Sequence, residues 1–357
     1  MIQTFQTIDA DGHVQEPTEA IAERLPAAMR DFAPRSALDA SGRIRQIVGG
    51  EWMPYIPVPD SGSWEIPLGG ADPKIRLADM DRQKISKSIL FPTFGLAFAG
   101  LSRTDVQIAL CRAYNDWLAE FCSADPKRLI GIAAPAQSDP RAALAETKRA
   151  VREYGFRGVM LRPNPIDGRT LLHRDWTPLY EFLEAEGIPL CVHEGTTQHV
   201  PQSGNDRFED FALRHVASHP HEEQLACLGL VMGGVLERHP GLRVVFLESG
   251  CGWLPHWLER MDDHAQSWGW AMPQLPLKPS EYFARQCFIS CDPGERTIES
   301  VVALCGEEIV VFATDYPHPD ALAGDLVARI EERTGLSAQA RSKILVDNAK
   351  RCFGFAT

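Results

Sequence analysis

Eight short apolar runs, separated by segments with helical spacing of apolar residues, constrain the fold of this chain more than any other feature. Between them, Arg141 to Tyr154 and Trp176 to Glu186 place apolar residues at helical intervals. Eight strands with intervening helices is the number that forms a (β/α)8 barrel. We therefore predict an α/β protein with a TIM barrel as one domain over residues 1–357. A doubly wound open sheet is the alternative, because periodicity does not show whether a sheet closes. The eight runs are Phe5–Asp9, Ser86–Phe91, Leu129–Ala134, Gly158–Leu161, Ile188–His193, Leu242–Glu248, Cys287–Cys291 and Glu308–Ala313.

One segment breaks the alternation. Asp31 to Pro73 is rich in Pro, Gly and Trp and shows neither a helix nor a strand period. Long irregular insertions after a strand usually act as lids or as binding surfaces. We expect such a lid or partner surface here, within the same domain. A second long segment, Thr196 to His221, follows the fifth strand and is expected to form part of the wall of the same barrel mouth.

Composition narrows the classes of partner. The formal net charge is −12 and no cluster of Lys and Arg occurs, which argues against nucleic-acid binding. The nine cysteines show no CxxC pairs, so we expect buried thiols in a reducing cytoplasm rather than disulfides or structural zinc. No leader-like start and no apolar stretch of about 18 residues is present, which indicates no membrane partner. A small molecule is the expected partner.

Three of the runs end in residues that can bind a metal ion. Asp11 and His13 follow the first run, His193 closes the fifth, and Asp315 follows the eighth. In a parallel barrel all strand C-termini open onto one mouth, so these side chains can converge there. Each has a simpler alternative: a turn at Asp11, a core histidine at His193, and a helix cap at Asp315. Together they predict a metal site.

Other polar residues are expected at the same mouth. Glu248 ends the sixth run, and a buried carboxylate there needs a partner: a metal-bound water, a histidine, a substrate proton, or Arg260 in a purely structural pair. Arg162 and Asn164 follow the fourth run, where Arg162 can bind a substrate carboxylate or instead pair with an acid. His219, expected in a loop near the mouth, is a weaker substrate-binding candidate.

With these residues the chain resembles the amidohydrolase superfamily, in the branch that includes aminocarboxymuconate-semialdehyde decarboxylase and the γ-resorcylate-type decarboxylases. The resemblance covers nearly the whole chain. It implies a distorted TIM barrel with one divalent ion, whose ligands map onto Asp11, His13, His193 and Asp315. The motifs that carry it are Ile8–Pro17, Val192–Gly195, Leu247–Pro255, Thr314–His318 and Asn348–Gly354.

Two departures from the family pattern affect the expected chemistry. The first of the usual two histidines is Asp11 here, and this hard oxygen ligand makes Mn²⁺ or Mg²⁺ more competitive with Zn²⁺. Glu248 stands where several relatives place a histidine. The resemblance suggests a homo-oligomeric decarboxylase of a small aromatic or unsaturated carboxylic acid. In that reaction the metal and Arg162 hold the carboxylate and Asp315 delivers a proton, with Glu248 assisting.

Two other functions stay open. A hydrolase of amide, lactone or C–C bonds would use a metal-activated water whose proton Asp315 accepts. A non-catalytic, metal-stabilised scaffold would bind another protein through the Asp31 to Pro73 insertion.

Overall fold

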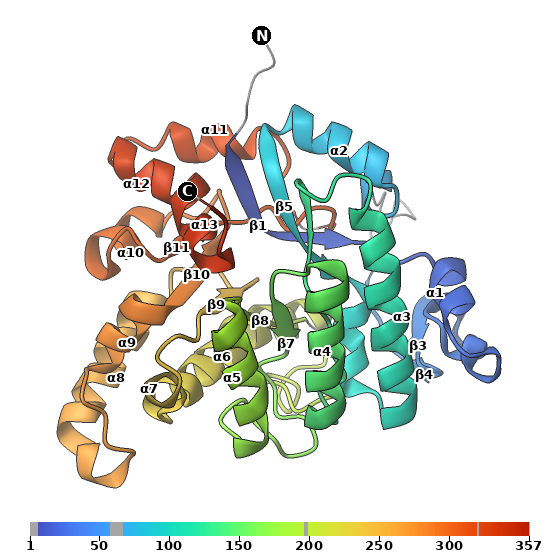
Figure 1. Ribbon diagram of the computed structural model, residues 1–357, viewed down its shortest axis with the longest axis horizontal. Coiled ribbons are helices and arrows are strands. Elements are labelled where there is room, and N and C mark those ends of the chain that lie inside the picture. Colours follow the sequence, from blue (N-terminus) through green and yellow to red (C-terminus); the bar gives the residue numbers. More distant parts are fainter. Residues whose placement is uncertain (1–5, 58–66, 196–198, 320, 357) are drawn as a thin grey trace.

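The computed structural model describes residues 6–57, 67–195, 199–319 and 321–356 (Figure 1). All eight predicted strands are present among the described residues, and each pairs in parallel with at least one neighbour. Phe5, the predicted start of the first strand, lies outside the described residues. Because the strands run parallel to one another, their C-termini lie at one mouth, as predicted for a barrel. The eight strands are β1 (Thr7–Val14), β5 (Ile85–Pro92), β6 (Leu129–Gly131), β7 (Val159–Leu161), β8 (Leu190–His193), β9 (Val244–Leu247), β10 (Cys287–Cys291) and β11 (Val310–Phe312).

The strands follow the cyclic order of a barrel, with two interruptions in the hydrogen-bonded ladder. One sheet has the order β1-β5-β6 and the other β11-β10-β9-β8-β7. A single parallel bridge between Ala133 and Val159 joins the two sheets on one side. On the other side β1 meets the residues after β11: Asp315 N–H donates to Asp11 O at 2.8 Å. The α/β barrel predicted from the sequence is thus confirmed as the fold, in a distorted form.

The helices cover the outside of the strands (Figure 1). Both predicted helices are confirmed, as α4 and α5. In α4 the side chain of Asp139 caps the first turn and Gly155, at φ 72°, ends the last one, as expected for such residues.

The α-helices are α1 (Thr18–Arg24), α2 (Pro73–Arg82), α3 (Thr104–Cys122), α4 (Pro140–Tyr154), α5 (Thr177–Glu186), α6 (Phe211–Met232), α7 (Val235–Arg238), α8 (Leu254–Trp268), α9 (Pro279–Gln286), α10 (Ile298–Cys305), α11 (Leu326–Glu331), α12 (Ala338–Ser342) and α13 (Asn348–Phe353). Short helical turns of other types are η1 (Ala27–Phe32), η2 (Leu68–Gly70), η3 (Phe94–Gly100), η4 (Arg174–Trp176), η5 (Gly269–Ala271) and η6 (Lys343–Asp347).

The insertion after the first strand is more regular than its sequence suggests. It contains a small antiparallel sheet of β2 (Arg35–Leu38), β3 (Ile44–Val48) and β4 (Glu51–Trp52). The hairpin between β2 and β3 turns at Asp39, whose Oδ1 accepts the backbone N–H of Ser41 at 2.9 Å. These strands are too short and too mixed in composition for a period of two to show. Residues 58–66 of the insertion lie outside the described part, and its role as a lid or partner surface stays a prediction.

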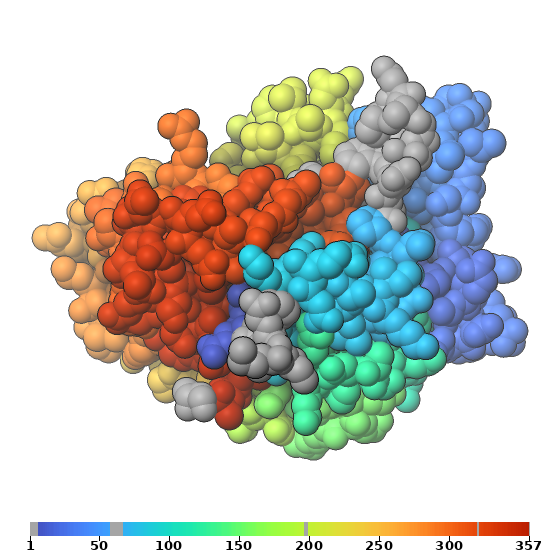
Figure 2. All heavy atoms as spheres, turned by 90° about the horizontal axis from the view of Figure 1, so that it is seen from above, coloured from blue at the N-terminus to red at the C-terminus, as the bar shows by residue number. Residues whose placement is uncertain are grey.

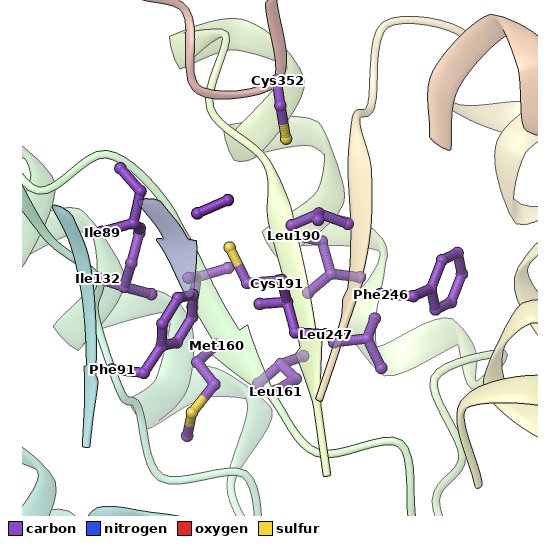
Figure 3. Packing of buried hydrophobic residues seen from close by; sticks show 14 of the residues in the cluster. Ile89, Phe91, Ile132, Met160, Leu161, Leu190, Cys191, Phe246, Leu247 and Cys352 are labelled. Carbon is purple, nitrogen blue, oxygen red and sulfur yellow. The ribbon is translucent and has the colours of Figure 1, made fainter. Parts of the chain in front are cut away.

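The barrel interior is apolar below the mouth. Ile89 and Phe91 of β5, Leu161 of β7 and Leu247 of β9 are fully buried and belong to one cluster of apolar side chains (Figure 3). All nine cysteines are free thiols, and eight of them are buried. Within the described residues, no helix combines the length and the apolar character needed to cross a bilayer.

Candidate metal centre

The four predicted metal ligands converge at the C-terminal mouth of the strands. Nε2 of His193 lies 3.2 Å from both Oδ1 of Asp11 and Nε2 of His13. Oδ1 of Asp315 lies 3.5 Å from Nε2 of His13. Asp11, His13 and His193 offer three ligand atoms that all lie within 4.8 Å of one another. Residues 304 positions apart in the chain therefore meet because the first and last strands are neighbours in the barrel.

The backbone carbonyls around the site orient both histidine rings. Nδ1 of His13 lies 2.9 Å from the carbonyl of Pro92, and Nδ1 of His193 lies 2.6 Å from that of Glu194. Since a carbonyl only accepts, each Nδ1 carries a hydrogen, and in its neutral form each ring would turn an Nε2 lone pair toward the site. Asp315 adds Oδ1, which lies 3.5 Å from Nε2 of His13 and 2.8 Å from Nδ1 of His318. Lone pairs that face one another in a buried space fit a divalent cation.

Two acids at the mouth have a left-handed backbone. Asp315 has φ 56° and Glu248 has φ 51°, a region that costs a residue with a side chain about 1 kcal/mol or more. Both follow buried strands, and the sharp turn directs both carboxylates back over the strand ends. Strain of this kind clusters at functional sites.

Charges within the site perturb the protonation of its ligands. Burial opposes a charge on His193, but the adjacent Asp11 carboxylate outweighs it and raises the pKa of His193 to about 9. Burial, assisted by His318, lowers the pKa of His13 to about 4. Burial also opposes the charge of Asp11, yet the nearby His193 and His13 hold the pKa of Asp11 well below its usual value. Without an ion, Asp11 is therefore ionised and His193 carries a proton that a metal would displace.

Glu248 faces histidines rather than Arg260. Its Oε2 lies 3.4 Å from Nδ1 of His193 and its Oε1 lies 3.4 Å from Nε2 of His219. Burial, followed by the charge of Asp315, raises the pKa of Glu248 well above its usual value. Of the partners considered for this carboxylate, the structure provides a histidine.

His219 does not lie in a loop, as the sequence suggested. It lies on α6 and is buried, with its ring stacked on that of His215 at a centroid distance of 4.2 Å. Pro220 lies inside this helix. An interior proline usually marks a helix boundary, so the sequence alone does not indicate one continuous helix here. The ring nevertheless reaches the mouth through Glu248, so its role in substrate binding stays a prediction.

Arg162 and Asn164 are occupied by the protein itself. An N–H of the Arg162 guanidinium donates to Oε1 of Glu194 at 2.8 Å, another donates to the carbonyl of Gly195 at 2.7 Å, and Nε–H donates to Oδ1 of Asn164 at 3.0 Å. Arg162, Asn164 and Glu194 are all fully buried. The internal ion pair that was the alternative for Arg162 is therefore present in the structure, and contact of Arg162 and Asn164 with a substrate stays a prediction. The pair braces the loop that follows His193.

One residue of the site was not singled out from the sequence. His318 places Nδ1 2.8 Å from Oδ1 of Asp315 and Nε2 3.0 Å from the hydroxyl of Thr93. Its ring lies 3.9 Å from that of His13. The available signal was the spacing Asp-x-x-His directly after the last strand, which brings two side chains to one turn.

Known proteins are similar to this chain in sequence and in fold. A family model described as Amidohydrolase matches residues 8–355. The 2-amino-3-carboxymuconate-6-semialdehyde decarboxylase of Dictyostelium discoideum is 26% identical over 321 residues, covering 88% of this chain and 82% of that protein. The γ-resorcylate decarboxylase of Rhodococcus jostii is 30% identical over 259 residues, covering 68% and 76%. A crystal structure of 5-carboxyvanillate decarboxylase from Novosphingobium aromaticivorans, complexed with manganese and 4-hydroxy-3-methoxy-5-nitrobenzoic acid, superposes with a TM-score of 0.74. It covers 99% of this chain and 97% of that one at 24% identity, a likeness of fold.

Proposed function

The chain belongs to the amidohydrolase family of enzymes, and from this premise we propose that it is a metal-dependent decarboxylase of a small aromatic or unsaturated carboxylic acid. The observation that carries the proposal is the convergence of Asp11, His13 and His193 at the mouth of the strands, with Oδ1 of Asp315 3.5 Å from Nε2 of His13. Two relatives that cover most of the chain are decarboxylases of such acids.

These four residues would hold one divalent ion. Asp11 and Asp315 supply hard oxygen ligands, which suit Mn²⁺ or Mg²⁺ as well as Zn²⁺. Manganese is the first ion to test, because the 5-carboxyvanillate decarboxylase structure contains it. When bound, the ion supplies positive charge that binds a substrate carboxylate and stabilises negative charge near it.

The protein's own groups supply the proton. Asp315 delivers it to the substrate carbon as the bond to the carboxylate breaks, and the electron pair of that bond becomes the new C–H bond. His318, 2.8 Å from Oδ1 of Asp315, holds that carboxyl in position. Glu248 lies between His193 and His219, where it can orient a substrate hydroxyl or a water molecule.

The hydrolase remains the second candidate, since the same ligands can activate water. Incubating the manganese-loaded protein with carboxylated phenols, and separately with amides, lactones and C–C hydrolysis substrates, distinguishes the two reactions. We expect CO₂ in amounts equal to the decarboxylated phenol, and loss of both products in Asp315→Asn. Hydrolysis products without CO₂ would overturn the decarboxylase proposal, and substoichiometric metal without any turnover would favour the scaffold. The proposed homo-oligomer is tested by light scattering on the same sample.

A further inference from the structure

We infer that Asp9 and Arg76 are positioning residues that set the distance between the two halves of the metal site. Two ligands, Asp11 and His13, come from β1, while Asp315 follows β11. This inference rests on the proposed metal site, but it concerns residues that supply no ligand atom. We refer to Asp9, Arg76, Ser88 and Thr314 as the junction network.

The junction between β1 and β11 is weakly bonded along the backbone. The two strands share no ladder, although they are neighbours in the barrel. Backbone contacts there are the bond from Asp315 N–H to Asp11 O at 2.8 Å and the bond from His13 N–H to Tyr316 O at 2.6 Å. Side chains must therefore supply the rest of the connection, in contrast to the continuous ladders within each of the two sheets.

Asp9 joins the two sides directly. Its Oδ1 accepts the backbone N–H of Thr314 at 2.9 Å and that of Asp11 at 3.3 Å. Its Oδ2 accepts the hydroxyls of Thr314 at 2.9 Å and Ser88 at 2.8 Å. Asp9 is 1% exposed. One buried carboxylate thus binds both the amide of a ligand on β1 and the residue before the ligand after β11.

Arg76 repeats this connection from outside the barrel. It lies on α2, which packs beside the C-terminal segment (Figure 2), where Lys84 and Asp325 form an ion pair at 2.7 Å. Its guanidinium donates to the carbonyl of His13 at 2.8 Å, to that of Tyr316 at 3.4 Å, and to the Ser88 hydroxyl at 2.8 Å.

The charge of Arg76 is matched within the network. Its guanidinium lies 3.9 Å from Oδ2 of Asp9 and 4.5 Å from the centre of the Tyr316 ring. Arg76 is 1% exposed, so leaving either charge without the other at this buried position is costly.

The contacts point to positioning because of where they fall. Apart from the bonds to Ser88, each contact reaches the backbone of a proposed metal ligand or the residue next to one. Loss of outer contacts of this kind typically lowers metal affinity 10–100-fold. Gly12 supports the same view. A Cβ atom at this position would collide with the side chains of Asp9, Arg76 and Ser88, so the network closes tightly over the backbone between the two ligands of β1.

The test measures metal affinity without substrate. Mn²⁺ binding to wild type and Asp9→Asn is compared by competition with a fluorescent chelator, with circular dichroism as a check of folding. We expect affinity in Asp9→Asn to fall about tenfold or more. The control is Gln286→Leu, which removes buried bonds to the carbonyls of His239 (2.7 Å) and Leu242 (2.8 Å) at the opposite end of the strands. Its affinity should stay at the wild-type value even if its Tm falls.

Unchanged affinity in folded Asp9→Asn would overturn the inference, and so would an equal loss in Gln286→Leu. If Asp9→Asn does not fold, Thr314→Val and Ser88→Ala each remove one bond to Asp9 and are read in the same way. Failure of the wild type to bind Mn²⁺ or Zn²⁺ would instead contradict the proposed function.

Discussion

Nδ1 of His318 lies 2.8 Å from Oδ1 of Asp315, and the two residues are three positions apart in the turn that follows β11. The same ring packs 3.9 Å from the ring of His13. His318 therefore contacts two of the four proposed ligands at once. In the sequence only the spacing Asp-x-x-His distinguishes it from the other histidines, and in the structure it follows the left-handed turn at Asp315.

Replacing His318 by glutamine should lower kcat for CO₂ release by about 10²-fold or more, because the contact that holds the catalytic carboxyl is lost. Metal stoichiometry should remain at one ion, since His318 is not among the four proposed ligands. The measurement is steady-state CO₂ release with metal analysis of the same sample. His264→Gln is the matched control, because that exposed ring bonds only the carbonyl of Arg260 at 2.9 Å among the described residues. Equal activity of His318→Gln and wild type would contradict the assignment.

Metal binding should release protons in a predictable pH window. Asp11 raises the pKa of His193 from its usual 6.5 to about 9, so this histidine is protonated at pH 7 in the ion-free protein. His13, with its pKa lowered to about 4, is already neutral. We expect about one proton to be released per ion at pH 7 and close to none well above pH 9. Calorimetric titration of Mn²⁺ in buffers of different ionisation enthalpy measures this number. No release at pH 7 would show that His193 is neutral before the ion binds.

Glu223 should limit stability at neutral pH. It is fully buried on α6, and neither carboxyl oxygen has a hydrogen bond among the described residues. Burial, and then the nearby Glu194, raises the pKa of Glu223 well above its usual 4.5. The folded state thus binds a proton that the unfolded state releases above pH 4.5, so this group's contribution to stability falls as pH rises from there toward the raised pKa.

The substitution Glu223→Gln should therefore increase the free energy of unfolding at pH 8 by about 1 kcal/mol or more, and have little effect at pH 4. Urea unfolding at both pH values measures this difference. The adjacent Glu222→Gln is the control. Oε1 of Glu222 accepts both the N–H of Ser203 at 2.5 Å and its hydroxyl at 2.7 Å, so this change should destabilise the protein. A loss of stability in Glu223→Gln at pH 8 would refute the expectation.

The proposed ligands could be predicted from the sequence, whereas the contacts of the residues that support them could not. The strands, and the convergence of the proposed ligands at their ends, were predictable because each depends on a local pattern and on one rule about parallel barrels. The partners of Arg162 were not, since Glu194 lies 32 residues away and its pairing depends on the loop after β8. The role of Asp9 could likewise not be predicted, because the residues that its hydrogen bonds join, Asp9 and Thr314, are 305 positions apart.

Substitution of Arg162 distinguishes a structural role of this arginine from the substrate contact predicted from the sequence. If its guanidinium braces the loop after His193, Arg162→Ala leaves Glu194 as an unpaired buried charge and should cost about 3–5 kcal/mol of unfolding free energy. Arg162→Lys should recover only part of that loss, because an ammonium group cannot reach Asn164, Glu194 and Gly195 in the fork geometry of arginine. Urea unfolding of the three proteins, together with KM for the carboxylate substrate, separates the two roles. A stable Arg162→Lys protein with a much higher KM would restore the substrate contact predicted from the sequence, whereas a destabilised one with unchanged KM would establish the internal ion pair as the reason for this arginine.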